Sequence, residues 1–571
     1  MASQPTLFTA SRAQTLTYLL AVCPFSIAFL VFMNSTVSFV VTELIGLHGG
    51  EGDAVGTLGF ADELLALAAC PVWGMLSDRI GVRHVCAAGY VIVALALALF
   101  VQATNVYPQL LLGRLLFSLG GAAVSTMVTA ILPAVTGTKH GGAQTHRGSV
   151  ASEAIVTPDG RPRREADELV LPTHPPSSRL AGFAGMFAGC GALVSLVVFL
   201  PLPERLGKSG LSPAQALQYS YYLVAVVALL VSVWCFIGFR NIPGEEGKGW
   251  GSLFLMHPHG MPQTTSHTSN LARSRPQLPY WKQVSVAVAL GFRNRNIGLG
   301  YLGGLVARAS SVGISLFIPL SVNHYYRASG LCDEDPSTEP GVGVGGIKRS
   351  CPNAYILASI LTGVSQLIAL LTAPAFGFLS EKSRRYHLPL LFATLAGVTG
   401  YIAFALLPSP QFKGADGTPG VFVVMALIGM SQIGAIVCSL GVLSNGILSV
   451  SAGEEEAALK QTRGVGASNH AGSDVGNGSS NEGGETGPTE QQPLLGEEEP
   501  RNQQSPQLVH LKGTIAGVYS LFGGAGILVL TKLGGLLFDV LSPSTPFFIM
   551  AGFNGLLCVM VVASGLVGIQ R

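Results

Sequence analysis

Charged residues are the scarcest feature of this 571-residue chain. Lys, Arg, Asp and Glu together make up 11% of it, and apolar residues make up 49%, with a mean hydropathy of +0.49. An ordinary soluble domain contains roughly 25% charged residues. So few charges cannot cover the surface of a soluble protein of this length, and so apolar a chain does not stay disordered. The composition excludes a soluble enzyme and favours a helical membrane protein, which also tolerates the 72 glycines.

Several chemical signatures are absent as well. The nine cysteines form no CxxC pair, and the chain contains no HExxH, no GxSxG and no nucleotide-binding P-loop. We therefore expect no enzyme activity, no metal site, no cofactor and no ATP-driven pumping. No segment indicates nucleic-acid binding.

Twelve apolar stretches are long enough to cross a bilayer, since a spanning helix needs about 20 residues. They are 17–46, 54–76, 85–104, 108–134, 180–201, 216–239, 297–322, 353–378, 387–408, 420–447, 513–531 and 544–568. The chain is thus predicted to be an all-α integral membrane protein. A shorter stretch, 280–292, predicts an interfacial helix.

Three long polar loops remain, at 138–179, 241–296 and 449–511. The first two are basic, so we expect them to meet anionic lipid. The third is acidic and rich in Gly, Ser, Asn and Gln, which predicts disorder. Of the 33 Lys and Arg, 24 lie on the side that holds both termini and these loops, and 7 lie on the other side. The positive-inside rule then predicts that both termini are cytoplasmic.

An internal repeat divides the chain. The end of the second stretch, Pro71-Val-Trp-Gly-Met-Leu-Ser-Asp-Arg79, matches Pro374-Ala-Phe-Gly-Phe-Leu-Ser-Glu-Lys382 at an offset of 303 residues. Helices 5 and 11 also match, at Gly189-Cys-Gly and Gly524-Ala-Gly. We infer two related six-helix halves, 1–240 and 297–571, joined by the linker 241–296. Repeats of this kind place the substrate site between the halves, near the bilayer midplane.

The first repeated motif, Gly74-x-Leu-Ser-Asp78-Arg79-x-Gly-x-Arg83, resembles the signature between helices 2 and 3 of the major facilitator superfamily. Its second copy comprises Gly377, Glu381 and Lys382. The resemblance implies two pseudo-symmetric six-helix bundles that alternate access, and it is closest to fungal vacuolar-type members. In physical terms, the glycine permits close helix packing and Asp78 can face the positive start of a neighbouring helix. Our candidates for a conformational latch are Gly74, Asp78, Arg79, Arg83, Gly377, Glu381 and Lys382. The alternative is that the arginines only set the orientation of the helices in the membrane.

A few charges lie at membrane depth, where each costs roughly 2.5–3.5 kcal/mol on insertion scales. Asp62, Glu63 and Arg114 are at similar depths in helices 2 and 4, so an Arg114–carboxylate pair is expected. Such a pair can couple transport to protons, or it can be a static packing element.

Arg308 is predicted to lie mid-membrane in helix 7. A guanidinium there can hold an anionic substrate through bidentate hydrogen bonds, or it can pair with a carboxylate of the other half. Asn34, Gln366 and Gln432 are uncharged polar residues at depth. They are candidates for substrate contact, with hydrogen bonding between helices as the alternative.

Two loop features complete the predictions. Cys332 and Cys351 lie on the non-cytoplasmic side, where a disulfide can form; two free thiols are the alternative. Glu490-Gln-Gln-Pro-Leu494-Leu495 has the form of an acidic dileucine sorting signal, which predicts recognition by sorting adaptors and a vacuolar or lysosomal membrane.

Taken together, the sequence predicts a monomeric secondary active transporter of a small polar or anionic solute, coupled to protons. A facilitative uniporter of the same fold and a non-transporting membrane sensor remain as alternatives.

Overall fold

The computed structural model is helical throughout the part of the chain that it describes, which is 10–46, 51–136, 177–208, 210–242, 245, 248–249, 280–331, 352–383, 387–412, 417–468 and 511–569. Within these residues, twelve helical spans are long and apolar enough to cross a membrane. Each coincides with one of the twelve predicted stretches, which confirms the predicted fold class.

The first six spans run from Arg12 to Gly238, and π-helical turns at 18–22, 40–44, 106–110 and 195–199 interrupt several of them. Their α-helices are α1 (Arg12–Thr17), α2 (Cys23–Phe39), α3 (Glu51–Ile80), α4 (Val82–Phe100), α5 (Leu111–Thr136), α6 (Ser177–Val194), α7 (Leu202–Gly207) and α8 (Pro213–Gly238).

The last six spans follow a separate helix, α10 (Tyr280–Arg293), and contain π-helical turns at 313–317 and 530–534. Their α-helices are α11 (Arg295–Val312), α12 (Ile318–Ala328), α14 (Pro352–Lys382), α15 (Leu388–Leu406), α16 (Gly420–Ser468), α17 (Lys512–Val529), α18 (Gly535–Val540) and α19 (Thr545–Ile569).

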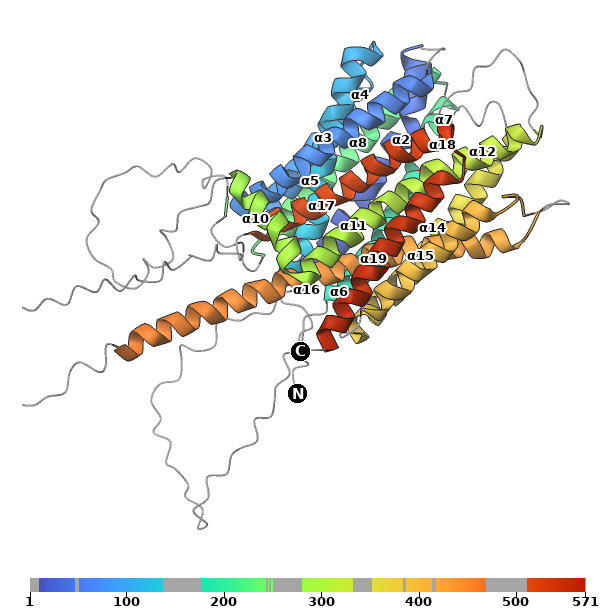
Figure 1. The fold of residues 1–571 in the computed structure, drawn as a ribbon. Helices are drawn as coiled ribbons and strands as arrows, with labels where there is room; N and C mark the ends of the chain where they lie inside the picture. The colour runs from blue at the N-terminus through green and yellow to red at the C-terminus, as the bar shows by residue number, and fades with distance from the viewer. Residues whose placement is uncertain are drawn as a thin grey trace, which may run out of the picture.

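Helix α16 corrects one prediction. It continues to Ser468, so residues 449–468 are helical, whereas the sequence predicted disorder over 449–511. The run Glu454–Gln461 consists of Glu, Ala, Leu, Lys and Gln, which are strong helix formers. An existing helix propagates into such a run without a new nucleation cost. Figure 1 shows the end of α16 projecting beyond the bundle.

The other loop predictions lie outside the described residues. These are the Cys332–Cys351 disulfide and the sorting signal at Glu490, Leu494 and Leu495, together with most of loop 138–179.

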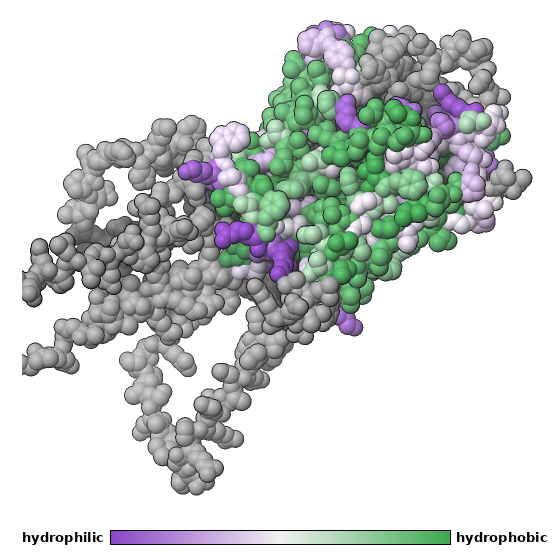
Figure 2. Space-filling model, viewed as in Figure 1, coloured by the Kyte–Doolittle hydropathy of each residue, from purple (hydrophilic) through white to green (hydrophobic). Residues whose placement is uncertain are grey.

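Two helix pairs make the most extensive contacts between the first six spans and the last six. Helix α3 packs along α17 (Figure 1), and α6 packs along α14; α6 also contacts α16, and α5 also contacts α17. In terms of span number the two main pairs are helix 2 with helix 11 and helix 5 with helix 8, so exchanging the halves exchanges the two pairs. We call the end of the bundle where α1 begins and α19 ends the terminal side. Figure 2 shows a broad hydrophobic surface over the spans, as contact with lipid requires.

Candidate functional site

Asp78, at the terminal end of α3, docks onto the start of α17. Its carboxylate accepts hydrogen bonds from the backbone N–H of Gly513 (2.6 Å), the backbone N–H of Thr514 (2.7 Å) and the Thr514 hydroxyl (2.7 Å). Free N–H groups and the positive end of the helix dipole make a helix start a favourable partner for an anion. The predicted contact between Asp78 and a helix start is therefore present, and it links the two halves.

Glu381, the counterpart of Asp78 in the repeat, docks onto the start of α6. Its partner is the guanidinium of Arg179, with which it forms an ion pair. Arg179 also lies over the ring of Phe378, 5.3 Å from its centroid. The second copy of the motif thus makes an inter-half contact too, but with a side chain rather than with backbone N–H groups.

The glycines of the motif allow these helices to touch. A Cβ added at Gly74 would overlap the carbonyl oxygen of Gly513, and a Cβ at Gly377 would lie 2.9 Å from the Cα of Gly182. Any side chain at either position would push the halves apart on the terminal side. On the terminal side, each half therefore contributes one glycine that approaches the other half closely and one acidic side chain that binds to it.

The remaining latch candidates are Arg79, Arg83 and Lys382. Arg83 donates from Nε to the carbonyl of Phe236 (2.6 Å) and covers the Phe236 ring, so it stays within the first half instead of pairing with an acid. Arg79 is half-buried, and Lys382 is exposed at the end of α14. A latch role for these three residues remains a prediction.

The linker adds a residue that the sequence did not indicate. Glu245 accepts a hydrogen bond from the N–H of Val82 (2.8 Å), at the start of α4, and pairs with Lys248 (2.8 Å). Gly81 turns the chain there with φ = +92°, and a Cβ on it would lie 2.6 Å from the Glu245 carboxylate. Lys248 also acts electrostatically on Asp78. The linker therefore supports the Asp78 contact.

Three side chains of the first half, Asp62, Arg114 and Asn34, are linked at membrane depth by an ion pair and a hydrogen bond. The Arg114 guanidinium pairs with the Asp62 carboxylate at 2.6 Å and also donates to the Asn34 side-chain oxygen. Asp62 and Arg114 are only 7% and 4% exposed, whereas Asn34 is exposed. The expected Arg114–carboxylate pair is present, with Asp62 as the partner. Asn34 is thus the solvent-accessible member of this group of three linked side chains.

Three uncharged side chains, Ser311, Gln366 and Gln432, form a hydrogen-bonded group at the equivalent place in the second half. Gln432 donates to the Ser311 hydroxyl (2.9 Å) and accepts from the Gln366 amide (3.2 Å). Gln432 is buried and Gln366 is exposed. The two groups use equivalent helices, namely helices 2, 4 and 1 in the first half and helices 8, 10 and 7 in the second. Both predicted glutamines thus belong to one hydrogen-bonded group.

Glu63 and Arg308 are two further charged residues at membrane depth, one in each half. Both are half-buried, and the positive charge of Arg308 acts on the Glu63 carboxyl, as does that of Arg114. Among the residues that the structure describes, no ion pair or hydrogen bond satisfies either group. The two charges attract each other but stay more than 4.0 Å apart.

One family model matches part of the chain. The model for the Major Facilitator Superfamily matches residues 24–153, which include Asp62, Arg114 and the first loop motif. Over this segment the chain is similar to that family. No curated protein matches the chain.

A solved transporter structure shares the fold of the chain. FucP, a major facilitator superfamily transporter in the outward conformation, matches with a TM-score of 0.52 at 12% identity, over 97% of this chain and 99% of that chain. A variant of the E. coli fucose:proton symporter FucP gives 0.49 at 12% identity over 97% and 99%. The proton:xylose symporter XylE gives 0.48 at 12% identity over 96% and 94%. At such identity, the first match concerns the fold alone.

Besides Glu245, reasoning from the sequence missed two partners, Arg179 and Lys532, and the internal repeat contained the signal for the first of them. Helices 5 and 11 match at an offset of 335 residues, which places Arg179 opposite Thr514 and Gly182 opposite Gly517. The Asp78–Thr514 contact therefore maps onto the Glu381–Arg179 contact. The other is Lys532 of helix 11, whose ammonium lies 3.9 Å from the ring centroid of Phe60 in α3. No sequence pattern pointed to it.

Proposed function

We propose that the chain is a member of the major facilitator superfamily and a secondary active transporter that couples a small polar or anionic solute to protons by alternating access. The observation that carries the proposal is the placement of two charged side chains at membrane depth, Glu63 in the first half and Arg308 in the second, close enough for the charge of Arg308 to act on the Glu63 carboxyl. A group held at this place binds to both halves at once. Its binding therefore favours closure of the halves around it, as alternating access requires.

The division of charge between the halves supports separate roles for them. The first half carries the titratable groups Asp62 and Glu63, and the second half carries Arg308 and the uncharged Gln366–Gln432–Ser311 group. A carboxylate can take up and release a proton, and the guanidinium with nearby amides can bind a polar or anionic solute. We therefore assign proton coupling to the first half and solute recognition mainly to the second.

Coupling between the two events follows from electrostatics. Without solute, the charge of Arg308 stabilises the ionised Glu63 carboxylate. An anion bound to Arg308 neutralises that charge, so the carboxylate loses a favourable partner and binds a proton more readily. Solute and proton then move together, and the pair Asp62–Arg114 keeps the neighbouring charge fixed.

Flux into proteoliposomes tests the proposal. Three solutes are compared: L-lactate as an organic anion, glycine as a zwitterion and D-xylose as an uncharged sugar. Each is measured with and without an inward proton gradient, and a pH dye inside the vesicles reports proton entry. We expect one class to enter with protons and the gradient to accelerate its uptake. In Glu63→Gln, that uptake should become independent of the gradient. Arg308→Lys should weaken it because the ammonium lacks the bidentate fork, and Arg327→Lys, in the same span, is the matched control.

Two outcomes would contradict the proposal. Uptake that ignores the gradient in the unchanged protein would favour a facilitative uniporter. Gradient-driven uptake that persists in Glu63→Gln and in Asp62→Asn would show that proton coupling lies elsewhere.

We further propose that the protein resides in a vacuolar or lysosomal membrane with both termini cytoplasmic. The support is the acidic dileucine pattern at Glu490, Leu494 and Leu495 and the excess of Lys and Arg on the terminal side. The variant Leu494→Ala/Leu495→Ala should relocate a fluorescently tagged protein to the plasma membrane. Unchanged localisation would refute the signal.

A further inference from the structure

Helix α10 differs from the spanning helices in its direction and in the exposure of its side chains. Figure 1 shows it running across the spanning helices at the terminal side, next to the start of α11. Trp281 is 88% exposed and Phe292 is 85% exposed, the highest values among the large apolar side chains of the described residues. Side chains that face lipid along the spans reach at most 69%. The two rings thus project clear of the protein.

The exposed residues of α10 form one face. Trp281 and Phe292 are eleven residues apart, which is about three helical turns, so they lie on the same side. Ser285 and Ala289 are exposed between them, and Ala287 is fully buried. A helix with one apolar face buried on protein and aromatic residues on the other is typical of the membrane interface, where such rings reside.

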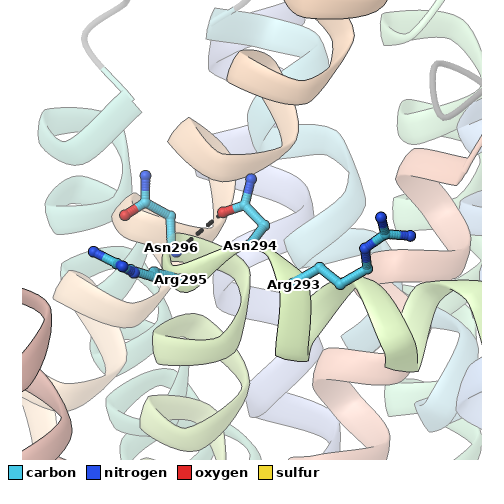
Figure 3. Close-up of a pocket in the computed structure, with 4 residues that line it drawn as sticks. All are labelled: Arg293, Asn294, Arg295 and Asn296. Atoms are coloured by element: carbon cyan, nitrogen blue, oxygen red, sulfur yellow. Dashed lines mark hydrogen bonds between the residues drawn. The ribbon is translucent and has the colours of Figure 1, made fainter.

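Basic side chains border this face. Lys282, Arg293 and Arg295 are all exposed, and the sequence contains no acidic residue between Glu246 and Asp333. Arg293, Asn294, Arg295 and Asn296 line a hollow of about 410 Å³ where α10 meets α11. Figure 3 shows the two arginines extending in opposite directions from this junction. They therefore reach two separate anionic groups, as the headgroups of a leaflet provide, rather than enclosing one phosphate.

From these observations we propose that the face of α10 bounded by Trp281 and Phe292, with Lys282, Arg293 and Arg295, binds anionic phospholipid in the leaflet on the terminal side. The rings enter the level of the headgroups, and the three cations attract the negative lipids. Each Lys or Arg near such a surface contributes about a fivefold preference, which corresponds to about 1 kcal/mol.

The bound lipid is connected to the inter-half contacts. The Tyr301 hydroxyl of α11 donates to the carbonyl of Ala287 in α10 (3.1 Å), and the Tyr301 ring leaves no room for a side chain at Gly291. On its other face, Tyr301 stacks on Phe522 of α17, with the ring centroids 5.1 Å apart. Lipid that fixes α10 thus also steadies α17, the helix onto which Asp78 docks.

The test uses the purified full-length protein in phosphatidylcholine vesicles that contain either brominated phosphatidylserine or brominated phosphatidylcholine. Bromine quenches tryptophan on contact, and the signal of Trp281 is the difference between the unchanged protein and Trp281→Phe. We expect phosphatidylserine to quench at several-fold lower concentration than phosphatidylcholine. The variant Lys282→Gln/Arg293→Gln/Arg295→Gln should lose this preference, whereas Arg205→Gln/Lys208→Gln/Arg327→Gln, which removes three charges outside α10, should keep it.

A second measurement covers the case in which the triple variant does not fold. The preference of the unchanged protein should fall in 1 M salt, where the screening length is about 3 Å. Equal quenching by both lipids would overturn the proposal. So would an absence of quenching by either lipid, since the face would then be covered by another segment of the chain or by a second copy. The assay requires no transport, so its result is independent of the proposed function.

Discussion

Replacing Asp78 by Asn tests how the terminal side stays closed. The carboxylate accepts three hydrogen bonds from the start of α17, two of them from backbone N–H groups. An asparagine side chain offers one acceptor oxygen in place of two, and its NH₂ group faces a donor. At least one backbone N–H therefore loses its partner, and the favourable interaction between a carboxylate and the helix dipole is lost as well.

The magnitude follows from these losses. A hydrogen bond to a charged group contributes about 1.5–3 kcal/mol, and a donor left unsatisfied costs about 1–3 kcal/mol. Taking about 3 kcal/mol for the sum, the equilibrium between the closed and open terminal side shifts about 100-fold toward opening. The fold itself should persist, because the α3–α17 packing outside this contact is unchanged.

Hydrogen exchange measured by mass spectrometry on peptides covering 512–518 reports this opening directly. We expect these amides to exchange about 100-fold faster in Asp78→Asn, with little change in peptides from the start of α6. Glu381→Gln is the matched control, since it should accelerate exchange around Arg179 and spare 512–518. Unchanged exchange at 512–518 in a folded Asp78→Asn protein would refute the reasoning.

Three further substitutions probe other contacts. Gly377→Ala places a Cβ 2.9 Å from the Cα of Gly182. Overpacking of this kind costs about 1–3 kcal/mol. We therefore expect solute flux to fall at least severalfold, while expression in the membrane stays normal. Asp62→Asn leaves Arg114 buried without its charge partner, which costs about 3–5 kcal/mol. The melting temperature of this variant should therefore fall. Asp62→Leu/Arg114→Met should restore the melting temperature without restoring gradient-driven uptake. Glu245→Gln weakens the cap on Val82; a charge-assisted cap contributes about 1 kcal/mol, so the 512–518 amides should exchange about fivefold faster, and unchanged rates would exclude support of the latch by the linker.

The spans and the depth of the charges could be predicted from the sequence because both depend on local composition. A run of about 20 apolar residues has one stable arrangement in a bilayer, and counting residues from its end places Asp62 and Glu63 at the depth of Arg114, without deciding which of the two pairs with it. Partner choice in the second half could not be derived in this way. Arg179 lies at the end of loop 138–179 in the sequence, and composition does not indicate its pairing with Glu381, because that pairing depends on the packing of α6 on α14. The helical part of 449–468 was missed because its low hydropathy masked its helix propensity.

The two inter-half contacts are related by the repeat, yet they differ in chemistry, and the difference has a consequence. Asp78 binds backbone N–H groups, which keep their position as long as α17 is helical. Glu381 binds Arg179, a partly exposed side chain that can rotate away and whose attraction is screened by salt. Opening of the terminal side requires both contacts to break. Because the Arg179 contact is the weaker of the two in water, the α6–α14 side should separate first, and the α3–α17 side should set the barrier.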